Sequence, residues 1–459
     1  MGQHALTISD AELEQLTQRA AKLATTYWSS LSERPAFPLT NGPQTFQHFT
    51  RSWDEAPRGS DVLQDFDIIA QHARPSVGGF FGYVAGSGEP VGALGDFLAS
   101  ALNQNVTAWR SAPSATVVER TVVKWLAESI GCGEFSGSLC GGGSAANLMG
   151  LAMAREAKLP ANEEGVKGGV VYASEEVHMS IPKSIALLGL GTHNLRRIAT
   201  DEQFRMRLDL LREAIAADRR AGLKPIAVVA SAGAVSTGAI DLLEEIAAVA
   251  REENLWMHVD GAYGAAAALA VPERFHGLAL ADSLSLDAHK FLYQPIDCGC
   301  LLFKDARFAR QAFSNNGDYV QVFSHDSVES FAFFDESMEL SRRFRALKLW
   351  MSFQYHGRRA FREAILDDLL HAQELAEAIQ KEPDLEVVAP IPLSAVCFRH
   401  RSKDNQTILR RVIERGRVFI SNATINGQFV LRACFVNHLT TEADVKAIVS
   451  EVLAAAEVA

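Results

Sequence analysis

The segment Ser283-Leu-Ser-Leu-Asp287-Ala-His289-Lys290-Phe has the form of a short apolar strand that ends in a charged turn. We interpret residues 283–286 as a buried strand that ends at Asp287, with a His-Lys pair at its carboxyl end. Upstream, Trp256-Met-His-Val-Asp260-Gly-Ala262-Tyr is a second apolar strand that ends in a carboxylate. Open α/β sheets bind ligands at the carboxyl ends of their strands, so the two segments point to one site.

A strand-end aspartate followed by a strand-end lysine indicates a pyridoxal phosphate (PLP) site. In such a site Lys290 forms a Schiff base with the cofactor, and Asp260 keeps the pyridine nitrogen protonated so that the ring accepts electrons. Either residue alone is more simply explained as a solvated turn residue. The upstream turn Gly141-Gly-Gly143-Ser144-Ala145 favours the cofactor. It opens a predicted helix, with Ser144 as the expected N-cap, and the N–H groups of a helix N-terminus suit a phosphate.

The segments Asp260-Gly-Ala262-Tyr and Asp287-Ala-His289-Lys290 resemble the group II PLP-dependent decarboxylases, which include the aromatic-L-amino-acid, glutamate and cysteine-sulfinate decarboxylases. The resemblance extends over roughly residues 60–440. It implies PLP fold type I, an α/β fold with a mostly parallel seven-stranded sheet and a small C-terminal α+β domain. We expect an N-terminal helical dimerisation arm at 1–75, a large PLP-binding domain at 76–355 and the small domain at 356–459.

Hydrophobic periodicity predicts several elements independently. Residues 8–33 form an amphipathic helix that is too thin to fold alone, and in the family such an arm packs on the partner of a homodimer. Strands at 225–231 and 255–260 flank a helix whose start, Asp241 to Glu244, resembles a capping box, so these strands should be parallel. The C-terminal part alternates between a helix (361–380), a strand (394–399), a helix (405–415), a strand (428–436) and a helix (441–456).

The resemblance also assigns cofactor residues. The backbone of Gly143, Ser144 and Ala145 would hold the phosphate. His178 follows a predicted strand at 170–174 and opens a helix at 180–188, and it matches the family histidine that stacks on the PLP ring and faces the substrate. Ala234 stands where the family usually has Thr, a hydrogen bond that Ala cannot donate. The complete set of expected cofactor contacts is Gly143, Ser144, Ala145, His178, Ala234, Asp260, Ala262, Asp287, His289 and Lys290.

Substrate contacts are expected at two places. The resemblance places Phe80, Phe81 and Tyr83 at the substrate mouth, although aromatic residues among glycines also serve as core filler. Val84 and Ala85 follow where aromatic decarboxylases typically have Phe-Pro. Arg432 matches a family arginine near the substrate carboxylate, whereas a single strand arginine is otherwise usually a surface charge.

The irregular segment 313–337 precedes Arg342-Arg343 and resembles the mobile catalytic loop of the family. That loop carries a Tyr about a dozen residues before the Arg pair, and an ungapped match places Phe333 there. Tyr319 is the only tyrosine in residues 313–340. A phenol can donate a proton and a phenyl ring cannot, so Phe333 predicts an altered product. The alternative is that Phe333 is an apolar lid residue.

Composition limits the remaining function classes. The net charge of −11 argues against a nucleic-acid partner, and no apolar run reaches membrane-spanning length. The start lacks a signal-peptide pattern, and the six cysteines suggest reduced thiols, so we expect a cytoplasmic protein. No Cys/His cluster has metal-ligand spacing, so we expect no metal site.

We therefore expect a PLP-dependent amino acid decarboxylase, a carboxy-lyase that acts on an L-amino acid, with an aromatic substrate favoured by the apolar mouth. One alternative is an aldehyde synthase, which decarboxylates and oxidatively deaminates, because Phe333 replaces the loop Tyr. Others are a decarboxylase of an acidic or other small amino acid and a non-catalytic PLP-binding paralogue. An intact Lys290, Asp260 and His178 argues against the last.

Overall fold

The computed structural model describes residues 6–38, 40–166, 168–314 and 328–458 of the chain. Tyr319 lies outside these ranges. The described helices are α1 (Asp10–Ser29), α2 (Gly42–Phe49), α3 (Asp65–His72), α4 (Pro90–Leu102), α5 (Pro113–Ser129), α6 (Gly143–Lys158), α7 (Ser180–Leu187), α8 (Leu208–Arg220), α9 (Leu243–Glu252), α10 (Ala306–Phe313), α11 (Ala346–Gln380), α12 (Asn405–Arg415) and α13 (Glu442–Glu457).

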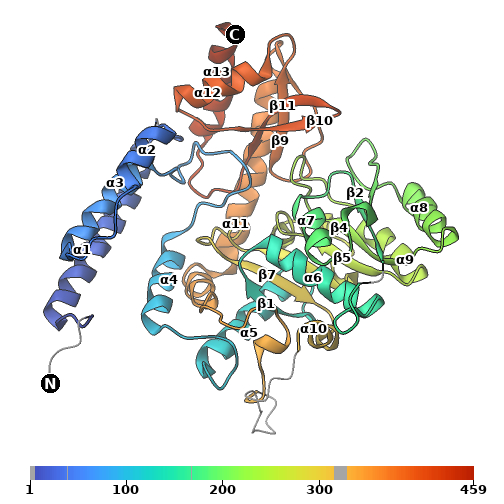
Figure 1. Cartoon of the computed structure of the whole chain (residues 1–459). Helices are drawn as coiled ribbons and strands as arrows, with labels where there is room; N and C mark the ends of the chain where they lie inside the picture. Colours follow the sequence, from blue (N-terminus) through green and yellow to red (C-terminus); the bar gives the residue numbers. More distant parts are fainter. Residues whose placement is uncertain (1–5, 39, 167, 315–327, 459) are drawn as a thin grey trace.

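A seven-stranded sheet forms the centre of the molecule (Figure 1). Its order is β1-β7-β6-β5-β4-β2-β3. All strand pairs formed among β2 to β6 are parallel. The strand β7 is antiparallel to both of its neighbours, β1 and β6. The mostly parallel seven-stranded sheet is thus confirmed. The strands are β1 (Ser136–Cys140), β2 (Val170–Ser174), β3 (Leu195–Ile198), β4 (Pro225–Ser231), β5 (Trp256–Asp260), β6 (Ser283–Asp287) and β7 (Gly299–Phe303).

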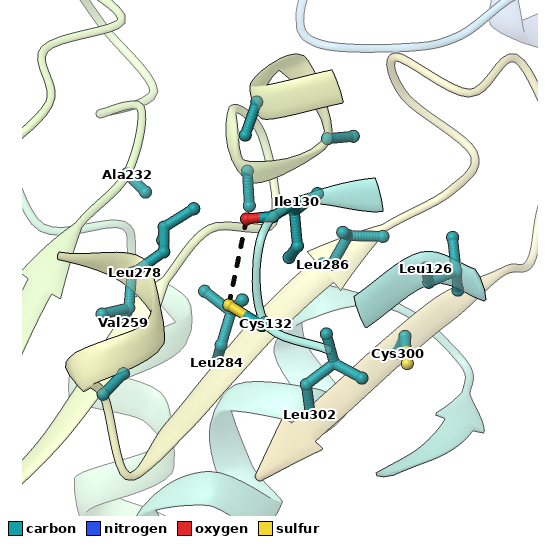
Figure 2. Close-up of a cluster of buried hydrophobic side chains, with 14 of the residues drawn as sticks. Leu126, Ile130, Cys132, Ala232, Val259, Leu278, Leu284, Leu286, Cys300 and Leu302 are labelled. Carbon is teal, nitrogen blue, oxygen red and sulfur yellow. Dashed lines mark hydrogen bonds between the residues drawn. The ribbon is translucent and has the colours of Figure 1, made fainter. Parts of the chain in front are cut away.

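Both faces of this sheet are buried, and side chains alternate between them along each strand. Val259, Leu284 and Leu286 point to one face, where they join a large apolar cluster with Leu126 and Ile130 of the α5 region (Figure 2). Trp256 and Leu301 point to the other face and pack with residues of α6 and α7. The inner strand β4 is a nearly continuous apolar run, as is typical of parallel sheets covered by helices on both sides, whereas β6 alternates serine with leucine.

A four-stranded antiparallel sheet and the helices α11 to α13 make up the C-terminal part of the chain (Figure 1). The sheet has the order β10-β11-β9-β8, with β8 (Leu385–Val387), β9 (Ala395–His400), β10 (Ser421–Ile425) and β11 (Gln428–Cys434). The predicted helices and the two predicted strands lie here within one or two residues, except that α11 already begins at Ala346. The strands β8 and β10 escaped prediction because each is short and β10 has only two buried residues.

The N-terminal helices stand apart from the central sheet (Figure 1). The predicted helix at 8–33 is confirmed as α1 followed by a short 3-10 turn at Leu31–Glu33, and none of its residues is buried. The arm contacts the rest of the chain near its end, where the N–H of Ala36 donates to the carbonyl oxygen of Gly416 at 3.0 Å and Phe37 stacks on Phe419 at 5.0 Å. The three domain boundaries proposed above stay predictions.

Two predicted helix caps are wrong. The N-cap of α6 is Gly142 (φ +127°), so Ser144 lies inside the first turn and caps nothing. Asp241 does not cap α9, because its carboxylate accepts the backbone N–H groups of Met206 at 2.6 Å and Ser231 at 2.7 Å. These bonds join the strand β4 to the loop before α8. The first helix thus begins earlier than predicted, and the second lacks its predicted cap because Asp241 is bonded elsewhere.

Within the described ranges, no helix is both long and apolar enough to cross a membrane. The same residues contain no group of three or more histidine, cysteine or acidic side chains arranged to hold a metal ion.

Candidate active site

A cavity of 520 Å³ opens at the carboxyl ends of β4, β5 and β6. Three segments that are far apart in sequence form its floor: the turn before α6, the end of β5 and the end of β6. The C-terminal part contributes β10 and β11 to its rim. The lining residues are Tyr83, Val84, Gly141, Gly142, Gly143, Ser144, Asn147, His178, Ser231, Gly233, Ala234, Val235, Ser236, Asp260, Ala262, Tyr263, Asp287, His289, Lys290, Ile296, Ser421, Asn422, Ala423 and Arg432.

Lys290 lies in the turn that follows β6, and its side chain is 18% exposed. Its Nζ is 3.1 Å from Oδ2 of Asp287, an acid that is itself buried. His289 lies beside the same acid, with its Nε2 3.6 Å from Asp287 Oδ2 and its Nδ1 3.1 Å from the carbonyl oxygen of Cys298, and burial lowers its pKa. The ammonium of Lys290 is therefore held at the cavity wall by one carboxylate.

Asp260 at the end of β5 is buried and fully hydrogen-bonded. Its Oδ2 accepts from Asn147 Nδ2 at 3.0 Å. Its Oδ1 accepts from the hydroxyl of Ser285 at 3.2 Å and from the N–H of Ala262 at 3.3 Å. These three donors fix the orientation of the carboxyl group.

His178 approaches the cavity from the segment between β2 and α7. Its Nδ1 lies 2.8 Å from the hydroxyl of Ser180 and accepts the N–H of the same residue at 3.2 Å. Burial lowers the pKa of His178 and the nearby charge of Lys290 adds to this, while Asp260 and Asp287 act in the opposite direction. Loss of solvent dominates, so the neutral imidazole is favoured.

The residues present fit a phosphorylated aldehyde cofactor. A Cβ at position 143 would lie 2.6 Å from Cβ of Ala262 and 3.0 Å from Oδ2 of Asp287, so only glycine allows this approach. The first two residues of α6, Gly143 and Ser144, line the cavity, and N–H groups at a helix N-terminus suit a phosphate. Asp287 Oδ1 is buried without a hydrogen-bond partner in the described chain. An amine, a buried acid and an anion cradle thus share one cavity.

Comparison with known proteins agrees with this geometry. The family model of the pyridoxal-dependent decarboxylase conserved domain matches residues 58–401. The chain belongs to the pyridoxal-dependent decarboxylases.

An aromatic-L-amino-acid decarboxylase of Bacillus atrophaeus is 34% identical over 469 residues, covering 98% of this chain and 97% of its own. A phenylacetaldehyde synthase of Petunia hybrida is 32% identical over 385 residues, covering 77% and 75%. The solved structure of Catharanthus roseus tryptophan decarboxylase in complex with L-tryptophan matches with a TM-score of 0.90 at 25% identity, covering 99% and 100%. The predicted family, fold type and PLP cofactor are confirmed.

The structure brings most of the predicted cofactor residues of this decarboxylase together. Nine of them line the cavity: Gly143, Ser144, His178, Ala234, Asp260, Ala262, Asp287, His289 and Lys290. Ala145 does not line it, and its N–H donates to the carbonyl oxygen of Gly142 at 2.9 Å inside the first turn of α6. The backbone of Ala145 is therefore not available to a phosphate. The individual roles of the nine residues stay predictions.

Two of the predicted substrate aromatics are misplaced. Phe81 is completely buried and packs on Phe435, with ring centroids 5.0 Å apart. Phe80 is also buried and stacks on Phe419 at 5.0 Å. Neither lines the cavity, so both are core residues, while Tyr83 lines the cavity and is 55% exposed. The alternative interpretation, that these aromatic residues fill the core, holds for the two phenylalanines.

Phe333 is also misplaced as a catalytic residue. Its ring is completely buried and does not line the cavity. The guanidinium of Arg342 lies 4.1 Å from the ring centroid, and the ring of Phe331 packs edge-on at 4.9 Å. Its N–H donates to the carbonyl oxygen of Thr107 at 2.8 Å. The ungapped count from the Arg pair therefore leads to a residue of the core.

Arg432 is buried at the cavity wall rather than exposed. It donates to three backbone carbonyl oxygens: those of Val235 at 2.6 Å, Tyr83 at 2.9 Å and Ser236 at 3.0 Å. No salt bridge to Arg432 occurs among the described side chains. A buried guanidinium that bonds only neutral groups leaves a positive field in the cavity.

Asn147 is a residue of the cavity lining that sequence reasoning missed. It is a buried amide on the inner face of α6, four residues into an otherwise apolar stripe. A polar side chain at that spacing was a signal that could have been used. The rim residues Ser421, Asn422 and Ala423 come from β10, whose strand was not predicted.

Proposed function

We propose that this decarboxylase converts an aromatic L-amino acid into the corresponding amine. The observation that carries the proposal is the single cavity in which Lys290, Asp260 and His178 meet Tyr83 and Arg432. When bound, PLP supplies the electron sink that permits loss of CO2. Lys290 provides the amine that holds it, and Asp260 provides a negative charge for a protonated ring nitrogen.

The substrate side is formed by Arg432 and Tyr83. The field of the buried guanidinium attracts the α-carboxylate, and its bonds to Tyr83 and Val235 hold the cavity wall in place. The half-exposed ring of Tyr83 offers an apolar surface to an aromatic side chain, next to Val84. The aromatic-L-amino-acid decarboxylase of Bacillus atrophaeus supports the same substrate class.

A second candidate is an aldehyde synthase. It would consume O2 and water and release CO2, ammonia, hydrogen peroxide and an aldehyde from the same amino acid. Support comes from the phenylacetaldehyde synthase of Petunia hybrida and from 4-hydroxyphenylacetaldehyde synthase of Rhodiola rosea, which is 30% identical over 459 residues. Phe333 no longer supports this candidate, because it lies in the core.

A substrate screen separates the candidates. The purified enzyme with PLP is incubated with the common L-amino acids, and amine, aldehyde and dissolved oxygen are measured together. We expect stoichiometric amine from tryptophan, tyrosine or phenylalanine without oxygen uptake. Aldehyde with equimolar oxygen loss would favour the synthase. Turnover confined to glutamate, cysteine sulfinate or another small amino acid would contradict the aromatic assignment, and no turnover with any substrate would favour a non-catalytic paralogue.

We also propose a homodimer. Exposed apolar side chains occur on α3, which belongs to the N-terminal arm, and on α4. The helix α1 buries no residue within its own chain. An apolar surface of this kind is typical of an interface. The exposed residues are Phe66, Ile68 and Ile69 on α3 and Leu94, Phe97, Leu98 and Leu102 on α4. Light scattering should give twice the chain mass, and a monomer at micromolar concentration would contradict the proposal. A cytoplasmic location stays a prediction.

A further inference from the structure

A continuous chain of buried hydrogen bonds runs beneath the cavity, from Trp256 to His178. Trp256 Nε1 donates to Ser283 Oγ at 2.8 Å, and Ser283 Oγ lies 2.8 Å from His258 Nδ1. His258 Nε2 lies 2.9 Å from Asn147 Oδ1. Asn147 Nδ2 then contacts both Asp260 and Ser180, and Ser180 contacts His178.

The direction of each bond follows from its neighbours. Asn147 faces the carboxylate of Asp260 at 3.0 Å, and only the NH2 end of its amide can donate there. The oxygen end therefore faces His258, whose Nε2 must carry a hydrogen. Burial lowers the pKa of His258 to about 4, so the ring is neutral and its Nδ1 accepts the hydrogen of Ser283. Each donor then faces an acceptor along this series of hydrogen bonds.

The second hydrogen of the Asn147 amide determines the direction of the hydrogen bonds that lead to His178. Asn147 Nδ2 donates to Ser180 Oγ at 2.9 Å, so the hydroxyl hydrogen of Ser180 is free to point at His178 Nδ1, 2.8 Å away. The N–H of Ser180, the first residue of α7, donates to the same nitrogen at 3.2 Å. Two donors at Nδ1 leave no room for a hydrogen on that atom.

We propose that Asn147 and Ser180 are positioning residues that hold His178 in the tautomer with its hydrogen on Nε2. The charge of Asp260 orients Asn147, Asn147 orients Ser180, and Ser180 fixes His178. His178 therefore presents an N–H donor to the substrate side of the cavity, and its Nδ1 is unable to act as a base. The proposal deepens the proposed function, because it assumes that His178 faces the substrate.

Chemical modification of the full-length chain, freed of cofactor, tests without turnover the hydrogen bond from Ser180 to His178 Nδ1 that fixes the tautomer. Diethyl pyrocarbonate acylates unprotonated imidazole, and peptide mass spectrometry gives the rate at each histidine. The ratio of the rates at pH 6 and pH 8 reports protonation independently of access. A hydrogen bond to Nδ1 stabilises the neutral ring, so Ser180→Ala should lower this ratio at His178 by roughly three- to tenfold. Asn147→Asp should lower it as well, because the new carboxyl group, which shares a proton with Asp260 beside it, accepts the Ser180 hydrogen that His178 otherwise receives.

Three controls make the result specific. Ser180→Thr keeps the hydroxyl and should retain the wild-type ratio. Ser184→Ala removes another buried serine of α7, one outside the cavity lining, and should change nothing. His400 accepts two backbone N–H groups at Nδ1 and should be unaffected in every variant. The charged groups near His178 are Asp260, Asp287 and Lys290, and all are unchanged in the serine variants.

The loaded enzyme provides an independent readout. In Ser180→Ala the acid limb of kcat/KM should move to higher pH, with Ser180→Thr close to wild type. An unchanged modification ratio in both Ser180→Ala and Asn147→Asp would overturn the inference, even if the enzyme decarboxylates aromatic amino acids. The expected ratios without any turnover would contradict the proposed function and leave the inference standing.

Discussion

The central sheet has two buried faces, supplied by the same strands, and the two differ in what they contain. On one face Met257, Val259, Leu284 and Leu286 belong to a continuous apolar cluster. On the other face the residues between them are polar and bonded to one another: His258, Asp260, Ser283 and Ser285. Because side chains alternate, one strand can serve packing on one side and chemistry on the other.

The energetic consequences of the two faces are different. Each large apolar side chain on the first face contributes through burial, at about 25 cal/mol per Å² removed from water. Burial of a polar group on the second face costs free energy unless the group is hydrogen-bonded. The polar groups there form one connected network of hydrogen bonds. Changes on the apolar face should therefore reduce stability, and changes on the polar face should first alter chemistry.

The largest expected effect is on the polar face. Lys290→Ala removes the amine that holds the cofactor, so turnover should fall by at least about 10⁴-fold while the fold persists. The measurement is product formation together with far-UV circular dichroism. Lys304→Ala, on an exposed lysine just after β7, is the matched control and should keep full activity. Substantial turnover in Lys290→Ala would mean that another lysine carries the cofactor.

The apolar face should show the opposite pattern. Leu286→Ala leaves a cavity beside Leu126 and Leu302, and the free energy of unfolding should drop by about 2–5 kcal/mol. Activity per folded molecule should stay near wild type at low temperature. Denaturant unfolding followed by activity assays measures both quantities. Leu223→Ala, on a half-exposed leucine, should change stability by less than about 0.5 kcal/mol.

What the sequence could predict depends on whether a feature is local or needs a partner that is distant in sequence. The strand ends Asp260 and Lys290 were recognisable because an apolar run that stops at a charge is a local pattern. The placement of Phe80 and Phe81 depended on Phe419 and Phe435, which cover their rings and are distant in sequence. Arg342, which covers Phe333, is near in sequence, but the backbone of Phe333 is bonded to the distant Thr107.

Asn147 was missed for a related reason. Its amide is buried in an apolar stripe, and its meaning depends on His258 and Asp260, which lie on other elements. The caps expected at Ser144 and Asp241 failed because other bonds decided these turns. Local pattern therefore identified the elements and the strand-end charges, while cross-element contacts determined the lining of the site.

Phe333→Tyr sharpens the comparison, because Phe333 belongs to the apolar cluster. A hydroxyl on this completely buried ring must displace its neighbours, so we expect a loss of about 2 kcal/mol in unfolding free energy. The ratio of amine to aldehyde should not change, since the ring does not reach the cavity. Product analysis of both proteins checks this. A shift from aldehyde towards amine in the variant would restore the catalytic role that the core contacts argue against.

The smallest expected effect is a pH dependence that arises from the polar face. The pKa of His258 is lowered to about 4 because complete burial disfavours the imidazolium, although the charge of Asp260 opposes this. The unfolded chain has an ordinary histidine pKa of about 6.5. Between these values the unfolded state binds a proton that the folded state does not, so stability is fully present above pH 6.5 and is lost as the pH falls towards 4. The loss due to this group should reach about 1 kcal/mol between pH 7.5 and 5.5.

His258→Gln isolates this contribution, because glutamine can donate to Asn147 Oδ1 but does not titrate. Unfolding free energies of the two proteins, measured from pH 7.5 to 5.5, should diverge, with the wild type losing more stability on acidification. Asp368 has a pKa raised to about 7 by burial and acts in the opposite direction, but it is present in both proteins and cancels in the difference. Parallel curves would mean that His258 takes up a proton in the folded state over the same pH range as in the unfolded chain. Its Nδ1 would then carry a hydrogen, and Ser283 would have to accept it rather than donate.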